Sequence, residues 1–260
     1  MSRGSFHVGT SGWSYNHWRG LFYPADMPPR EWFSHYSAHF PTVEINYSFY
    51  RLPAKKTFLR WREQGPTQFV YAMKAPRSIT HLRKLRRTEE ALDRFLQRAR
   101  LLGRKLGPIL YQLPPNLHLD EERLADFLNL LPGDLHHVIE FRHHSWHCER
   151  ILELLREKQV AFCHISLPDF PCPFPITGAI VYVRMHGVGV KYSGSYDEQQ
   201  LRDLATRVDQ LLEQGLDAYI YFNNDAYAYA VENAWQLGQL LEDLVRRGDA
   251  QGSYALHETG

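Results

Sequence analysis

The chain has 260 residues, of which 44% are apolar and 23% are charged, and its formal net charge is +1. This composition is typical of a globular protein with a large buried core, and it excludes a disordered or collagen-like chain. The balanced charge gives no overall attraction to nucleic acid or membranes, and no apolar run reaches the ~18 residues of a membrane span, so we expect no membrane partner.

Eight short runs rich in Val, Ile, Tyr and Phe predict eight β-strands. In chain order these runs are Phe6–Thr10, Thr42–Asn46, Phe69–Lys74, Ile109–Gln112, Val138–Phe141, Ala161–Ile165, Ile180–Met185 and Ala218–Phe222. Apolar residues at helical spacing predict six helices between and after them. These helices are Arg30–Phe40, Thr88–Gly103, Asp120–Leu131, Ser145–Lys158, Asp197–Gln214 and Val231–Val245.

Repeated strand–helix alternation on this scale predicts an α/β fold, a (β/α)8 TIM barrel of parallel strands. The alternative is a doubly wound sheet, but the first turn, from Gly9 to Trp13, lacks the glycine pattern of dinucleotide-binding folds. Four prolines between residues 168 and 175 predict an extended connection without a regular helix between strands six and seven. We expect residues 1–245 to form a single barrel domain and residues 246–260 to form a polar, frayed tail.

The cysteines and the N-terminus bear on location. Cys148, Cys163 and Cys172 form no CxxC pair, which favours a reducing, cytoplasmic location over a disulfide scaffold. The N-terminus enters a strand-like segment within a few residues, so we expect no signal peptide.

Polar residues recur at the ends of the predicted strands. Alternate side chains of a strand point to opposite faces, so polar residues two apart share a face. In a barrel the apolar face lies under the helices, which directs the polar face inward at the C-terminal rim, where TIM barrels build their active sites. The pairs two apart are Glu44 and Asn46, Glu140 and Arg142, and Arg184 and His186, and the other polar strand ends are Lys74, Gln112, Asn223, Asn224 and Asp225.

These residue types suit acid–base chemistry on a polar substrate. Glu44 or Glu140 is the candidate general base, and Lys74 or His186 the candidate acid. The remaining candidates bind substrate: Arg142 and Arg184 as an anion clamp, Asn46, Gln112, Asn223, Asn224 and Asp225 as polar contacts, Trp13 and Tyr15 as stacking surfaces, and Lys191 in a glycine-rich loop as an anion ligand. The alternative is a purely structural ionic plug, with Glu140 paired to Arg142 or Arg184.

The order of motifs resembles the YecE-like family, whose members are TIM-barrel proteins of unknown function described as sugar-isomerase-related. The resemblance covers roughly residues 6–245 and implies the same barrel. Two positions depart from the family pattern, Tyr47 and Ala228. The motifs that carry the resemblance are Gly9 to Tyr15, Phe22-Tyr23-Pro24, Glu44-Ile45-Asn46, Lys74-Ala75-Pro76, Gln112-Leu113-Pro114-Pro115, Phe141-Arg142-His143, Tyr182-Val183-Arg184, His186-Gly187 and Asn223-Asn224-Asp225.

Three functions remain open at this stage. The first is an isomerase-like enzyme acting on a small polyhydroxylated or phosphorylated, anionic substrate. The second is a phosphodiester hydrolase or nucleic-acid-binding protein, because residues 77–105 hold ten basic and three acidic residues. The third is a barrel that binds a ligand without converting it. His143, His144 and His147 crowd one loop without a metal-ligand spacing, so the sequence assigns no metal and identifies no cofactor.

Overall fold

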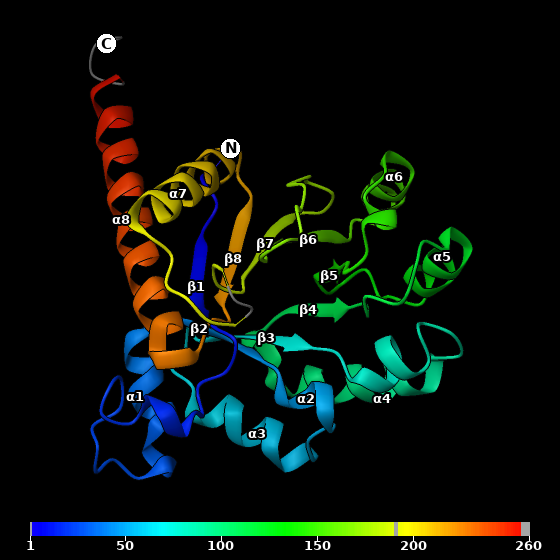
Figure 1. Cartoon of the computed structure of the whole chain (residues 1–260), viewed down its shortest axis with the longest axis horizontal. Coiled ribbons are helices and arrows are strands. Elements are labelled where there is room, and N and C mark those ends of the chain that lie inside the picture. Colours follow the sequence, from blue (N-terminus) through cyan, green and yellow to red (C-terminus); the bar gives the residue numbers. More distant parts are fainter. Residues whose placement is uncertain (1, 190–191, 256–260) are drawn as a thin grey trace.

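The computed structural model of the chain describes residues 2–189 and 192–255. Eight parallel strands close into a barrel in which β8 pairs with β1, so the predicted TIM barrel is confirmed (Figure 1). The strands are β1 (Phe6–Thr10), β2 (Thr42–Ile45), β3 (Val70–Lys74), β4 (Leu106–Gln112), β5 (His137–Glu140), β6 (Ala161–Ser166), β7 (Ile180–Met185) and β8 (Asp217–Phe222).

Helices surround this barrel and connect its strands. No helix joins β6 to β7, as the prolines of that segment predict. The sequence analysis missed α2, which has only four residues, and α3, which buries only Phe58 and Trp61. The α-helices are α1 (Trp32–His39), α2 (Tyr47–Tyr50), α3 (Lys55–Gln64), α4 (Glu89–Ala99), α5 (Glu121–Asn129), α6 (Glu149–Glu157), α7 (Glu198–Glu213) and α8 (Tyr229–Ala255).

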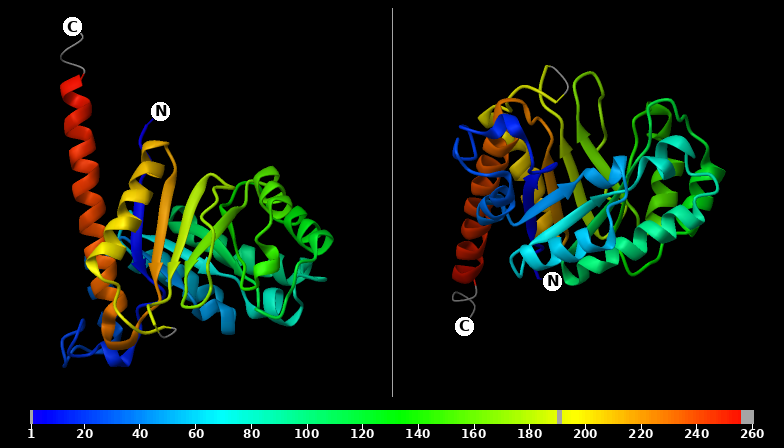
Figure 2. Two further views of the ribbon diagram at one scale, coloured as in Figure 1. Left: turned by 45° about the horizontal axis from the view of Figure 1, so that its top comes forward. Right: turned by 90° about the horizontal axis from the view of Figure 1, so that it is seen from below.

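The last helix is longer than the sequence analysis predicted. It ends at Ala255 rather than Val245, and its final turns project beyond the rest of the molecule (Figure 2). No proline interrupts this segment, and adding residues to an existing helix avoids a new nucleation step, although Gly248 and Gly252 are poor helix formers. No helix in the described part of the chain is long and apolar enough to cross a membrane.

The barrel interior changes from apolar to polar along the strands. Ala72, Leu110 and Val138 are fully buried in it and belong to one apolar cluster with Tyr182 and Tyr221. The opposite faces of the strands pack against the helices in a second, larger apolar cluster. The inward positions that remain at the C-terminal ends are the charged and amide side chains, so the barrel concentrates them at one end.

Helices α6 and α7 end in the same way, which allows a direct comparison of two residues. After α7, Gly215 has φ +86° and Leu216 donates its N–H to the carbonyl of Leu211. After α6, Gln159 has φ +53° and Val160 donates its N–H to the carbonyl of Leu155. Both are Schellman caps, whose left-handed position favours glycine. The exposed Gln159 therefore carries a backbone strain that Gly215 avoids.

We predict that Gln159→Gly raises the free energy of unfolding by about 1 kcal/mol, because a left-handed conformation costs a residue with a Cβ atom roughly 1–2 kcal/mol. Gly215→Ala is the matched control and lowers it by about the same amount. Urea unfolding measures both, and a lower midpoint for Gln159→Gly contradicts a strained backbone at Gln159.

Candidate functional site

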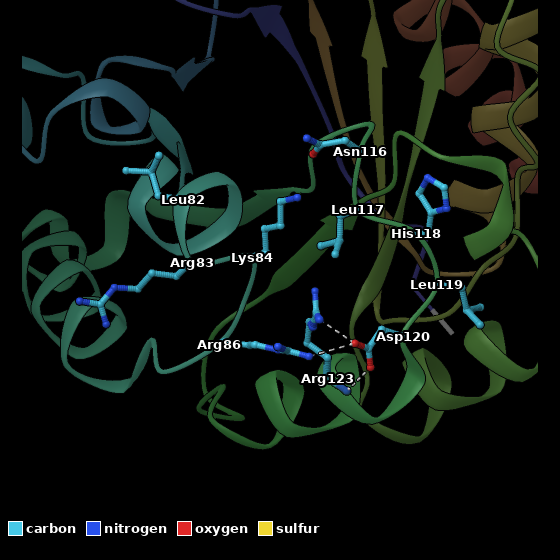
Figure 3. A pocket seen from close by; sticks show the side chains of 10 residues that line it. All are labelled: Leu82, Arg83, Lys84, Arg86, Asn116, Leu117, His118, Leu119, Asp120 and Arg123. Atoms are coloured by element: carbon cyan, nitrogen blue, oxygen red, sulfur yellow. Dashed lines mark hydrogen bonds and ion pairs between the residues drawn. The ribbon is translucent and has the colours of Figure 1, made fainter.

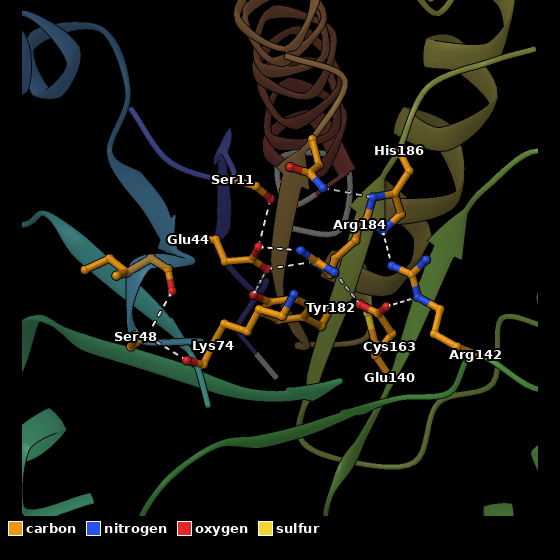
Figure 4. Close-up of polar contacts among 12 residues, drawn as sticks. Ser11, Glu44, Ser48, Lys74, Glu140, Arg142, Cys163, Tyr182, Arg184 and His186 are labelled. Atoms are coloured by element: carbon orange, nitrogen blue, oxygen red, sulfur yellow. Dashed lines mark hydrogen bonds and ion pairs between the residues drawn. The ribbon is translucent and has the colours of Figure 1, made fainter. Parts of the chain in front are cut away.

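Arg184 connects two carboxylates across the inside of the barrel (Figure 4). Its Nε and Nη2 donate to both oxygens of Glu44, at 2.9 and 2.8 Å, and its Nη1 donates to Glu140 Oε2 at 2.6 Å. The three side chains come from β7, β2 and β5, and their exposed fractions are 1%, 0% and 0%. The inward orientation inferred from strand alternation is therefore present, and the groups are paired.

Three further side chains complete this network, and the sequence analysis assigned none of them a role. Ser11 Oγ donates to Glu44 Oε1 and Tyr182 Oη donates to Glu44 Oε2, each at 2.8 Å. The Cys163 thiol lies 3.9 Å from Glu140 Oε2, and burial raises the pKa of this thiol, which keeps its proton on sulfur. Tyr182 and Cys163 lie on the inward parity of their strands, the one sequence feature that identifies them.

A second chain of contacts begins at Arg142. Its Nε donates to Glu140 Oε1, and its Nη2 lies 2.9 Å from His186 Nε2. A guanidinium only donates, so Nε2 accepts and the histidine proton resides on Nδ1. The side-chain nitrogen of Asn223 lies 3.1 Å from Nδ1, and because two N–H donors cannot pair, we assign the amide with its oxygen toward the ring, where it accepts from Nδ1.

The electrostatics of the network fix two protonation states. Burial alone raises the pKa of Glu140, but Arg142 and Arg184 outweigh burial and hold this pKa well below its usual range. Burial, Arg184 and Arg142 lower the pKa of His186 well below its usual range. At neutral pH Glu140 is therefore an ionised, fully paired carboxylate, and His186 is a neutral imidazole.

Lys74 is a charged side chain beside the network that pairs with none of its members. It ends β3 with 9% of its surface exposed, and its Nζ lies 4.2 Å from the centre of the Phe49 ring. No ion pair or hydrogen bond of this amine is found within the described residues. Two carboxylates already balance Arg142 and Arg184, so a proton on Lys74 adds an uncompensated charge. Burial, followed by the charge of Arg184, lowers the pKa of Lys74 to about 7.

The other predicted residues divide between the mouth and its surroundings. Asn46 and Gln112 lie partly exposed at the mouth, but Asn224 is buried and donates to Gly194 O and Asn233 Oδ1, a structural role in the described chain. The carboxylate of Asp225 faces His17 at 3.3 Å rather than the network. The predicted anion ligand Lys191 lies outside the described residues.

Trp13 and Tyr15 line a separate cavity of about 490 Å³ beside the end of β2. Its wall also includes Asn46, whose Oδ1 is buried and has no hydrogen-bond partner in the described part of the chain. Such an unpaired acceptor costs roughly 1–3 kcal/mol unless a ligand or water supplies a donor. The lining of this cavity is rich in aromatic side chains, with Asn46 as one of its polar members.

The paired arrangement changes the roles expected for the carboxylates. Sequence reasoning allowed Glu44 or Glu140 to act as a free base, or to be part of an ionic plug, and the observed contacts are those of the plug. The physical reason is that buried ions cost several kcal/mol each unless they are paired and hydrogen bonded. In the described residues no group of three or more His, Cys, Asp or Glu side chains could hold a metal ion.

We predict that Arg184→Met lowers the free energy of unfolding by about 3–5 kcal/mol, because it leaves two buried carboxylates without their shared partner. Replacing Glu44 and Arg184 together, as Glu44→Gln with Arg184→Met, costs less free energy than the single change, because it removes one charge of each sign and leaves Glu140 paired with Arg142. Arg202→Met, which removes an exposed pair with Glu198, is the control and changes stability by less than about 1 kcal/mol. Equal effects of the buried and exposed changes in urea unfolding contradict a stabilising role for Arg184.

Comparisons with known proteins agree with this barrel. The chain is 26% identical to the UPF0759 protein YunF of Bacillus subtilis over 91% of the chain and 94% of that protein. It is 33% identical to the UPF0759 protein YecE of Escherichia coli, over 53% of the chain and 48% of that protein. A DUF72 family structure from Thermotoga maritima superposes with a TM-score of 0.82 at 28% identity, covering 92% of this chain and 99% of that one. One from Enterococcus faecalis gives 0.76 at 22% identity, covering 93% and 99%.

The family resemblance inferred from the motifs is confirmed at the level of the whole barrel. The profile of the family described as "Protein of unknown function DUF72" matches residues 7–253, and the chain therefore belongs to the DUF72 family, which includes the YecE-like proteins.

Proposed function

We propose that the protein is an isomerase-like enzyme that moves a proton on a small, polyhydroxylated and anionic substrate at the C-terminal mouth of the barrel. The observation that carries this proposal is the unpaired Lys74 amine, which lies beside a neutral ion network and has a pKa of about 7. A group with this pKa exchanges protons efficiently at neutral pH.

The same charge balance favours an anionic substrate or intermediate. Protonated Lys74 leaves one positive charge that no carboxylate of the network neutralises. A negative charge on the substrate compensates this excess, and the guanidinium of Arg142, with 9% of its side chain exposed, is in position to share it.

Lys74 rather than a carboxylate or His186 is the proposed proton carrier. Glu44 and Glu140 are both bound by Arg184, and the Nε2 lone pair of His186 faces Arg142. In an isomerisation, the neutral amine takes the C–H proton next to the substrate carbonyl, and the electron pair moves onto the carbonyl oxygen. The proton of the hydroxyl on the deprotonated carbon then moves to the former carbonyl oxygen. The ammonium returns its proton to the former carbonyl carbon.

The mouth also offers groups that suit substrate hydroxyls. The amides of Asn46, Gln112 and Asn223 are partly exposed there. Asn46 also lines the cavity beside the end of β2. The aromatic side chains of Trp13 and Tyr15 line the adjoining cavity and supply an apolar face for a ring.

We predict that Lys74 reacts with an acylating reagent in its neutral form, with a rate that rises to half its maximum near pH 7 rather than near pH 10.4, the value of an ordinary lysine. Competitive labelling followed by peptide mass spectrometry measures this rate, and the exposed Lys55 and Lys56 of α3 serve as internal controls. A half-maximum for Lys74 that coincides with the controls contradicts the proposed environment.

We also predict a linked pH dependence of stability. The unfolded chain keeps the Lys74 proton up to about pH 10.4, whereas the folded chain loses it near pH 7, so stability rises with pH between these values. Lys74→Met lacks this contribution. The difference in unfolding free energy between wild type and Lys74→Met therefore shifts in favour of wild type as the pH rises from 7 to 10, and a constant difference contradicts the pKa assignment.

Turnover is tested by incubating the protein with a pool of small polar metabolites and following each compound by mass spectrometry. We expect one anionic polyhydroxylated compound to convert to an isomer of equal mass, and we expect Lys74→Met and Lys74→Arg to lose this conversion by at least about 100-fold. Retention of a compound without conversion favours a ligand-binding barrel and contradicts the enzymatic proposal.

A further inference from the structure

A basic cavity of about 640 Å³ lies between the loop that follows β3 and the loop that follows β4 (Figure 3). Its lining includes Arg83, Lys84, Arg86 and Arg123, and a single acidic residue, Asp120. None of the residues of the ion network lines it. The cavity is therefore a second concentration of charge, separate from the mouth.

The positive charges of this cavity exceed the negative charge that faces them. The Asp120 carboxylate lies 2.8 Å from Arg123 and 3.7 Å from Arg86, so one carboxylate serves two guanidiniums. Arg83 and Lys84 make no ion pair with any described residue. Arg123 keeps only 15% of its side chain exposed, and its buried Nε–H finds no acceptor in the described chain. An anion in the cavity compensates the excess charge.

The loop that carries these residues has a strained backbone. Lys84, Leu85 and Arg87 have φ values of +46°, +69° and +52°, a region that costs a residue with a Cβ atom roughly 1–2 kcal/mol. Leu85 is buried, and its N–H donates to the carbonyl of Ile79, which holds the loop in place. Strain of this kind persists where surrounding contacts enforce it, and it concentrates at ligand-binding sites.

A neighbouring cavity of about 480 Å³ shares Arg83 and extends the basic surface. Arg77 and Arg94 lie on its wall, and no acidic residue lines it, although Glu90 pairs with Arg94 from outside the lining. The ten basic residues counted between 77 and 105 therefore do not all form a solvated helix face, because part of them surrounds two adjoining cavities.

We propose that the cavity formed by Arg83, Lys84, Arg86 and Arg123 is a binding site for a phosphate group. Guanidiniums recognise phosphate oxygens with paired N–H donors, and a phosphate carries the additional negative charge that this excess requires. The site follows β3 and β4 and so differs from the loops after strands seven and eight that often bind phosphate in this fold. It does not depend on the role proposed for Lys74.

Two sources can supply the phosphate, namely a small phosphorylated molecule or the backbone of a nucleic acid. The test uses pyrophosphate, measured by titration calorimetry, and a short fluorescent single-stranded DNA, measured by anisotropy. Binding of both probes is compared between wild type and the double variant Arg83→Gln, Lys84→Gln. The control is Lys55→Gln, Lys56→Gln, which removes the same charge from the exposed start of α3.

We expect the Arg83 and Lys84 variant to bind at least one probe with an affinity at least about tenfold lower than that of wild type. The control variant retains wild-type affinity. The thermal unfolding temperature of both variants equals that of wild type. Pyrophosphate binding without DNA binding assigns the site to a small ligand. DNA binding that weakens steeply with salt assigns it to a phosphodiester backbone. The proposal is overturned if neither probe binds wild type, or if the control loses affinity as much as the cavity variant.

Discussion

The pairing of charges inside a closed barrel is the constraint on which this structure depends. Arg184 binds Glu44 and Glu140 at the same time, so β2, β5 and β7 are tied together through one guanidinium. A free carboxylate at that depth costs several kcal/mol, and a shared arginine with Ser11 and Tyr182 as further donors removes most of this cost. The network therefore holds three strands together and sets the charge that neighbouring side chains experience.

The network affects its neighbours through its charge balance, because neither of its carboxylates is free. Its carboxylates are neutralised by arginines, so the Lys74 amine that borders it experiences burial and two neighbouring guanidiniums without a carboxylate of its own. The same arginines keep His186 neutral and orient its tautomer through Arg142. The pairing of the carboxylates and the lowered pKa of Lys74 are thus two consequences of one arrangement.

Strand periodicity predicted the barrel and the inward face of its polar residues, because both depend on local alternation. It did not predict which charges meet, since Glu44 and Arg184 are 140 residues apart and their contact depends on barrel closure. The same limit explains why Ser11, Tyr182 and Cys163 went unassigned and why Asp225, next to two amides in sequence, faces His17. Helices α2 and α3 were missed because few of their residues are buried, which weakens the apolar period.

The distribution of charge separates two kinds of basic residue in this protein. Arg142 and Arg184 are compensated by buried carboxylates and contribute to the fold, whereas Arg83 and Lys84 lie in a cavity whose single carboxylate is already shared. A net charge of +1 for the chain conceals this difference, because acidic residues elsewhere balance the total. Compensation at each site, rather than the count of arginines, therefore separates the paired arginines of the barrel interior from the basic residues of the cavity.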